Sequence, residues 1–351
     1  MQVTWRKILL TLTSVLFSLN LWAKDNAVIL LYHHVSETTP AVTSVSPETF
    51  RQHMQYLADN HKVIALQTVI EKLKNNQALP DKAVVITFDD GYNNLYHQAH
   101  PILKEFGFAY TIFINPPLIG QASYQLTWQQ IEEMASEKAT FANHASEHLH
   151  LLTKDPAESQ QTWLTRVTEN IQSAEQILEQ RLGYKLKYFA YPYGEFDLPL
   201  KRHLEKLGYT SFAQHSGAIA SHSDFSALPR FPAAGIYSNI NSLKVKLNSL
   251  AMPIANPQPA NPNIELADVP QQISFDVVTD DINLGQINCF QNGQSLAVQL
   301  QQKTVVASLN EIVKAGRTRI NCTAPSIEQG GRFYWYSQPI FIPTAEGKWL
   351  D

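Results

Sequence analysis

Residues 83–91 read AVVITFDDG, and this stretch predicts the fold. Six apolar or β-branched residues in succession are typical of a strand buried on both faces, as in a parallel sheet. Two carboxylates and a glycine follow directly, at the carboxyl end of the predicted strand. Barrels of parallel strands place their active sites at that end. The stretch therefore predicts both a central strand and a candidate site.

The region around this stretch alternates between short apolar runs and helical patterns, which predicts βα units and a mainly parallel sheet. The clearest helix is 158–182, where apolar residues recur every three or four positions and Gly183 ends the pattern. The other predicted strands are 27–32, 109–114, 140–142, 187–191 and 210–214, and the other predicted helices are 50–60, 66–74, 94–106 and 127–136.

The last third of the chain has a different pattern. Residues 253–272 contain five prolines with several Asn and Gln, a composition typical of a linker. Residues 273–351 hold seven short strand-like runs, the last two at 332–336 and 340–342, which predict a small β-sandwich. The two cysteines, Cys289 and Cys322, lie in this part. In an exported chain they predict a disulfide, with a pair of buried thiols as the alternative.

The N-terminus predicts export. Arg6 and Lys7 precede a mostly apolar run at 8–22, and Ala23 is a small residue suited to cleavage. Residues 1–23 are therefore interpreted as a signal peptide that sends the protein to the periplasm, the cell surface or the medium. The alternative is an uncleaved anchor, although the run is short for a membrane span. No later stretch could cross a membrane.

The overall charge excludes one class of partner. Formal net charge is -4 and the isoelectric point is about 6.3, with no basic stripe that could follow a phosphate backbone. Nucleic acid is not an expected partner, and the oligomeric state is left open.

Polar side chains follow several of the predicted strands. His33 and His34 follow the first strand, and His144 and His148 follow another. Two imidazoles four residues apart would share one face of a helical turn, and two histidines with one carboxylate are a common set for catalytic zinc. Each feature alone also has an ordinary explanation. The histidine spacing occurs in surface composition, and Asp-Asp-Gly is good turn chemistry.

Four motifs occur in order: LYHHV at 31–35, TFDDG at 87–91, HxxxH at 144–148 and YPYG at 191–194. Over roughly residues 27–235 the chain resembles the polysaccharide deacetylases, also called NodB-homology or carbohydrate esterase family 4 proteins. The first motif is similar to the branch with bacterial poly-N-acetylglucosamine deacetylases. The resemblance implies a distorted (β/α) barrel of about seven strands over 26–252, before the predicted Ig-like sandwich.

The resemblance also implies residue roles. Asp89 would be the general base, and Asp90, His144 and His148 would bind a divalent metal, most often zinc, with Co²⁺ or Ni²⁺ as alternatives. Tyr193 would offer a backbone N–H to the oxyanion. The polar groups would then divide the work of amide hydrolysis between metal binding and proton transfer.

The chain departs from the family pattern at three places. Ala145 replaces a usual Ser or Thr. Phe189 and Ala190 stand where many members have an arginine that pairs with the base, and we expect Arg230 to supply that charge, with a surface arginine as the alternative. The late histidine that protonates the leaving amine has no clear motif. His215 is the candidate, and His33 or His34 could also reach the pocket.

The sequence thus predicts a metal-dependent N-deacetylase of an N-acetylglucosamine-containing polysaccharide that releases acetate. Poly-β-1,6-N-acetylglucosamine, chitin oligomers and peptidoglycan remain open as the polymer. The alternative is an inactive glycan-binding or cell-surface protein on the same scaffold. A glycosidase is a weaker third, because adjacent aspartates cannot flank a sugar bond at the required separation.

Overall fold

The computed structural model describes residues 25–310 and 313–350. The predicted signal peptide at 1–23 lies outside the described residues. Within the described ranges, no helix is both long enough and apolar enough to cross a membrane.

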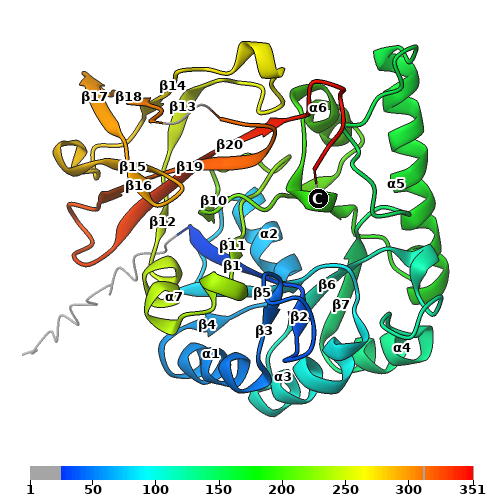
Figure 1. Ribbon diagram of the computed structural model, residues 1–351. Helices are drawn as coiled ribbons and strands as arrows, with labels where there is room; N and C mark the ends of the chain where they lie inside the picture. Colours follow the sequence, from blue (N-terminus) through cyan, green and yellow to red (C-terminus); the bar gives the residue numbers. More distant parts are fainter. Residues whose placement is uncertain (1–24, 311–312, 351) are drawn as a thin grey trace, which may run out of the picture.

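The α/β domain is built on one curled sheet (Figure 1). Its strands follow the order β10-β1-β5-β6-β7-β8-β9. All neighbours along this order are parallel except β10, which runs antiparallel to β1. The path has seven strands, and its two end strands are not paired with each other, so the barrel is open. The predicted distorted barrel of about seven strands is confirmed in this curled form.

The strands of this sheet match most predicted bounds within one to three residues. They are β1 (Asn26–Tyr32), β5 (Ala83–Phe88), β6 (Tyr110–Ile114), β7 (Ala139–Asn143), β8 (Tyr188–Ala190), β9 (Thr210–Phe212) and β10 (Ala218–Ala220), with β4 (Lys62–Val63) and β11 (Phe231–Pro232) paired off the path. A separate pair consists of β2 (His34–Val35) and β3 (Ser44–Val45).

Helices lie around the outside of the sheet (Figure 1). They are α1 (Pro47–Asn60), α2 (Leu66–Lys74), α3 (His100–Phe106), α4 (Trp128–Ser136), α5 (Gln160–Leu182), α6 (Leu198–Lys206) and α7 (Ile240–Leu247). A π-helical segment, η1 (Leu95–Ala99), runs directly into α3, and short 3-10 turns are η2 (Pro116–Leu118), η3 (Pro192–Gly194) and η4 (Gly235–Tyr237). In α5, the Ser159 hydroxyl accepts a hydrogen bond from the Thr162 amide, and Gly183 ends the helix at φ +74°. These are standard caps.

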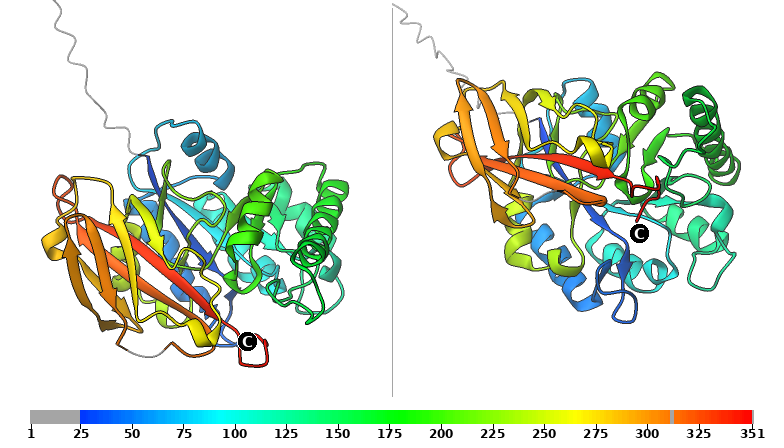
Figure 2. Two further views of the ribbon diagram at one scale, coloured as in Figure 1. Left: turned by 90° about the horizontal axis from the view of Figure 1, so that it is seen from above. Right: turned by 45° about the horizontal axis from the view of Figure 1, so that its top comes forward.

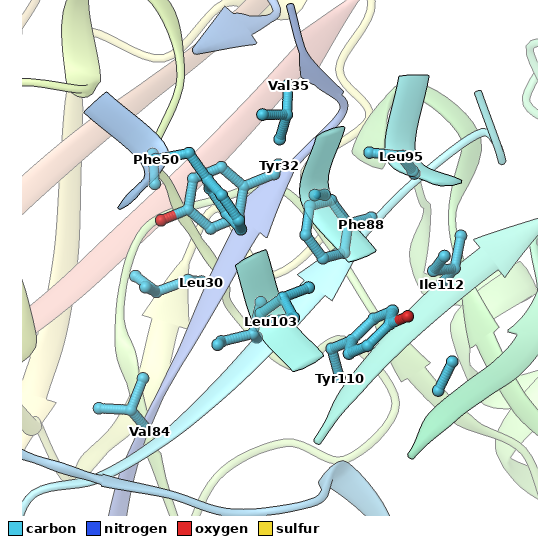
Figure 3. Close-up of a cluster of buried hydrophobic side chains, with 14 of the residues drawn as sticks. Leu30, Tyr32, Val35, Phe50, Val84, Phe88, Leu95, Leu103, Tyr110 and Ile112 are labelled. Carbon is cyan, nitrogen blue, oxygen red and sulfur yellow. The ribbon is translucent and has the colours of Figure 1, made fainter. Parts of the chain in front are cut away.

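The main core lies between the sheet and these helices. Alternate residues of β1 and β5 point to it, among them Leu30, Tyr32 and Phe88, where they meet Phe50 of α1 (Figure 3). The rings of Tyr32 and Phe50 meet edge to face at 5.2 Å. A fully buried strand needs apolar side chains on both faces, which is why the pattern of 83–88 is continuous rather than alternating.

The C-terminal region consists of two further sheets around their own core. One sheet has the order β12-β20-β19-β15-β16 and the other β13-β14-β18-β17. The strands are β12 (Leu250–Ala251), β13 (Ile254–Gln258), β14 (Gln272–Val277), β15 (Asn288–Gln291), β16 (Gln294–Ser295), β17 (Ala297–Gln301), β18 (Thr304–Ser308), β19 (Gly316–Pro325) and β20 (Phe333–Ile342), with turns η5 (Leu266–Asp268) and η6 (Leu284–Gln286). Cys289 and Cys322 form the predicted disulfide between β15 and β19.

Two details differ from the predictions for this region. Part of the stretch interpreted as a linker forms β13, and Pro257 fits there because β13 is an edge strand with an irregular register. The last two predicted runs, 332–336 and 340–342, are one strand, β20. Pro339 is tolerated within it because β12 pairs only with Tyr334 and Trp335, which leaves one neighbouring strand at Pro339.

The β region lies against one side of the α/β domain in all three views (Figures 1 and 2). Strand β12 directly follows α7 and joins the sheet of β20. Arg332 of the β region pairs with Asp81 at 3.0 Å, and the rings of Phe231 and Trp335 meet edge to face at 5.1 Å. The two parts therefore share a packed interface.

Candidate metal and catalytic site

The turn after β5 has an unusual backbone. Asp90 has φ +73° and Gly91 has φ +72°, so two consecutive residues are left-handed. Asp tolerates this conformation better than most side chains, and glycine has no penalty. The turn directs Asp89 and Asp90 to different partners. The Asp-Asp-Gly turn that the sequence suggested therefore also separates the two carboxylates.

Gly91 also has a steric role that a variant can measure. A Cβ at Gly91 would lie 2.8 Å from Ile114 Cγ2, whereas a Cβ at Gly183, with a similar φ of +74°, meets nothing within 4 Å. We expect Gly91→Ala to lose about 2 to 3 kcal/mol of unfolding free energy and Gly183→Ala about 1 kcal/mol. Urea denaturation of both variants measures the difference. Equal losses would show that Ile114 yields to the methyl group.

The two histidines lie in a loop, so the helical turn expected from their spacing is wrong. Ala145, between them, has φ +68°. The Asn143 Oδ1 accepts a 2.8 Å hydrogen bond from the Ala145 amide, and the Asn115 side chain donates hydrogen bonds to the carbonyls of His144 and Ala145. Side-chain hydrogen bonds therefore fix a left-handed loop in place of a helix. Asn115 could not be singled out from the sequence.

Asp90, His144 and His148 bring one ligand atom each within 4.8 Å of one another. Asp90 Oδ1 lies 3.2 Å from His144 Nε2 and 3.4 Å from His148 Nε2. Asp90 Oδ1 and His144 Nε2 are buried without a hydrogen-bond partner. The His144 Nδ1 lies 2.8 Å from the Ala190 carbonyl, a contact that directs the Nε2 lone pair to the other atoms.

This donor set fits a divalent metal. Two imidazoles and one carboxylate are ligands that zinc prefers, and three protein ligands leave positions for water and substrate. Burial lowers the pKa of His148 to about 4, which keeps the ring neutral as a ligand. Burial opposes the ionisation of Asp90, but the neighbouring His144 and other imidazoles outweigh it and hold the pKa of the carboxyl below its usual value. Unpartnered buried atoms of this kind call for a bound cation.

Asp89 is paired with Arg230. Two parallel hydrogen bonds of 2.7 Å join the guanidinium to both carboxylate oxygens, and both side chains are 0% exposed. The Arg230 Nε donates to the Ala213 carbonyl at 3.0 Å. Burial alone would raise the pKa of Asp89, but the Arg230 charge outweighs burial and lowers it. Arg230, which immediately precedes β11, thus lies where the sequence analysis expected the missing charge.

The histidines after β1 take different positions. His33 is half-buried and close enough to Asp90 to interact with its charge. The His34 ring stacks on Tyr92 at 3.8 Å and hydrogen-bonds to the Asn94 side chain at 2.8 Å. Burial, together with the nearby Asp90 charge, raises the pKa of the Tyr92 hydroxyl, so Tyr92 lies beside Asp90. His34 therefore supports the site through Tyr92, a residue that the sequence analysis missed because nothing distinguished it from other tyrosines.

His215 lies elsewhere. Strand β9 ends at Phe212, and the half-buried His215 ring packs near Phe196 at the wall of a cavity between the two domains. Its electrostatic neighbours are Asp224, Arg319 and Lys201 rather than the candidate metal ligands. Burial lowers the pKa of His215 to about 3. His215 also lines a groove together with Tyr193, and its carbonyl accepts a 2.9 Å hydrogen bond from the Arg230 amide, but it does not belong to the group formed by Asp90, His144 and His148.

Tyr193 lies beside the candidate metal ligands. It has φ +58° in the turn η3, and its ring meets His148 edge to face at 4.4 Å. The other side of the ring stacks on His150 at 3.9 Å. The buried Glu195 lies 2.9 Å from His150 Nδ1 and accepts a 2.8 Å bond from Arg317 of β19. The β region therefore contacts the loop that carries Tyr193.

Comparison with known proteins agrees with this geometry. Residues 76–212 match the family model for polysaccharide deacetylase. The chain is 29% identical over 182 residues to YxkH of Bacillus subtilis, which covers 52% of this chain and 61% of YxkH. It is 25% identical over 246 residues to the poly-beta-1,6-N-acetyl-D-glucosamine N-deacetylase of Escherichia coli, covering 60% of this chain and 37% of that protein. The chain spans less than two thirds of either relative.

Solved structures share the fold. The Streptococcus pyogenes deacetylase PplD in complex with acetate gives a TM-score of 0.57 at 23% identity, over 64% of this chain and 99% of PplD. IcaB from Ammonifex degensii gives 0.56 at 24% identity, over 64% of this chain and 97% of IcaB. These likenesses concern the overall architecture.

Proposed function

We propose that this chain, which through its α/β domain belongs to the polysaccharide deacetylase family, is an exported hydrolase that removes acetyl groups from an N-acetylglucosamine-containing polysaccharide. One observation carries the proposal. Three atoms suited to bind a metal lie close together, and two of them are buried without a hydrogen-bond partner. Beside them lies the buried Asp89 carboxylate, which is paired with the Arg230 guanidinium. A protein that only binds glycans has no need of this combination.

The chain's own residues would divide the reaction between them. Asp90, His144 and His148 would hold a divalent metal, with zinc favoured by the donor set and Co²⁺ or Ni²⁺ as alternatives. Bound there, the cation would supply Lewis-acid chemistry to the acetamide carbonyl and to water. Asp89 would take the proton of the attacking water, because two of its lone-pair positions remain when Arg230 occupies the others.

Two further groups complete the proposed mechanism. The backbone N–H of Tyr193 would stabilise the developing oxyanion, and the edge contact of its ring with His148 supports that position. An amide nitrogen leaves only when it is protonated, so a proton donor is required. His33 is our proposed donor, since it is half-buried and directly follows Tyr32, which pairs in the sheet with Phe88, the residue before Asp89.

Acetate release tests the proposal directly. The metal-loaded protein is incubated with oligomers of β-1,6-linked N-acetylglucosamine, chitin oligomers and peptidoglycan fragments, and acetate is quantified. Release from at least one polymer is expected. Stoichiometric metal binding without release from any of them would favour an inactive glycan-binding protein on this scaffold.

Asp90→Ala separates metal binding from the rest of the site. We expect the wild type to retain about one zinc ion per chain and the variant to lose it, because a catalytic zinc needs three protein ligands. Elemental analysis after dialysis against dilute chelator measures the loss. The control is Glu147→Ala, since Glu147 is exposed in the same loop and is not one of the three ligands. Equal metal content in the two variants would contradict the ligand assignment.

A further inference from the structure

A groove runs from the loop of Tyr193 to the β region. It encloses about 640 Å³ and is lined by residues of both domains. Tyr193 and Gly194 form the end near the proposed catalytic site, and Tyr237 and Trp335 are aromatic parts of the wall. Asn292 of the turn between β15 and β16 also contributes. Aromatic rings and side-chain amides are groups that hold extended sugar chains.

The charge of this groove is one-sided. Three cations line it, Lys246 of α7 and Arg317 and Arg319 of β19, and no carboxylate among the described residues does. Arg317 is neutralised by Glu195. Lys246 and Arg319 have no carboxylate partner in the part of the chain that the structure describes.

Lys246 and Arg319 come from different domains and meet at one ring. The Lys246 Nζ lies 4.7 Å from the ring centre of Tyr237, and the Arg319 guanidinium lies 5.3 Å from it. Arg319 also donates a 2.9 Å hydrogen bond to the Tyr237 hydroxyl. The Lys246 side chain is only 8% exposed. Burial, with a smaller contribution from the Arg319 charge, lowers the pKa of Lys246 to about 8, and the Lys246 Nζ donates to the Pro232 carbonyl at 3.3 Å.

A purely structural reason explains the position of one of these two cations, Lys246. Lys246 lies in the last turn of α7, where a positive charge interacts favourably with the helix dipole. That does not explain why a second cation, Arg319, lies at the same ring, where its charge opposes that of Lys246. A bound anion would remove the conflict.

We propose that the groove formed by Lys246, Arg319 and Tyr237 binds an acidic group, a carboxylate or a phosphate, on the glycan whose acetamide lies in the catalytic site. This rests on the proposed function and narrows its substrate to an acidic N-acetylated glycan. The same groove repels an ammonium group. A chain that has already lost acetyl groups carries such ammonium groups, so the groove disfavours extensively deacetylated polymers.

Binding of matched oligosaccharides tests the proposal without turnover. Three probes of equal length are titrated by calorimetry into the Asp89→Asn protein: a neutral N-acetylglucosamine oligomer, one that alternates with glucuronate, and one that carries phosphate groups. Two partly desolvated cations should favour an acidic probe about tenfold at low salt. The carboxylate and phosphate probes distinguish the two sources of the anion.

Two variants test whether the preference for an acidic probe arises in the groove. Arg319→Gln should lower the ratio of acidic to neutral affinity about tenfold and flatten its salt dependence. Lys244→Gln is the matched control, because Lys244 lies on the same helix over Tyr56 and does not line the groove. Equal affinity of the wild-type groove for all three probes, or a parallel loss of acidic and neutral binding in Arg319→Gln, would overturn the proposal.

The outcomes separate this proposal from the proposed function. Preferential binding of an acidic probe, with no acetate released from any probe by the wild type, would support the groove and contradict the deacetylase. Acetate release without a preference for acidic probes would support the deacetylase and contradict the groove.

Discussion

Replacement of Asp89 by asparagine is expected to lower kcat for acetate release by about 10³-fold, within the range typical of a lost general base. The amide keeps the size and shape of the carboxylate but cannot accept a proton at neutral pH. The metal ligands Asp90, His144 and His148 are unchanged, so zinc content should remain as in the wild type. This separation of metal content from turnover is the signature of a base that binds no metal.

The comparison requires a folded variant, because the amide leaves the buried Arg230 without its anion. Activity and metal content are therefore measured well below the thermal midpoint, which is determined for each protein. Glu147→Gln serves as the control for a carboxylate lost from the exposed part of the histidine loop. If Asp89→Asn turned over substrate at the wild-type rate, the proton acceptor would have to be another group.

The sequence predicted the central sheet well because its strands are buried on both faces. The continuous apolar run 83–88 is typical of a strand in a parallel sheet, and β5 has the predicted bounds. The short strands β10 and β11 and the helices α6 and α7 were missed. Prolines and short lengths weaken their periodicity, so contacts with the rest of the sheet determine them.

For the candidate site, the location of each residue directly after a predicted strand was more informative than the four-residue spacing of the two histidines. Asp90, His144 and His148 converge because each follows a strand of one parallel sheet, and no helix is needed to bring the histidines together. Arg230 could be predicted because Phe189 and Ala190 leave Asp89 without the usual arginine partner, so that the charge has to come from another strand. His215 lies apart from the three metal ligands because the chain turns towards the β region after β9, which the end of β9 alone does not reveal.

Arg230→Met is expected to destabilise the protein by about 3 to 5 kcal/mol at pH 7, since it leaves a fully buried carboxylate without a partner. Methionine is close to arginine in length and retains the contact with the Phe113 ring over which the guanidinium lies. Urea denaturation in the presence of chelator measures the loss without a contribution from metal binding. Asp89→Asn/Arg230→Met is the matched control and should recover much of the stability, because it removes the unpaired charge.

The pH dependence of this loss identifies its cause. In the wild type the pKa of Asp89 is lowered, so the ion pair stabilises the fold above the unfolded pKa of about 4 and this contribution is lost as the pH falls. Without Arg230, burial is opposed only by the neighbouring imidazoles of His144 and His33, and we expect it to raise the pKa of Asp89 above its unfolded value. The deficit of Arg230→Met should then be largest at neutral pH and should shrink towards pH 4, where the carboxyl becomes neutral. A deficit of equal size at both pH values would assign the loss to packing around Phe113 instead of to the buried charge.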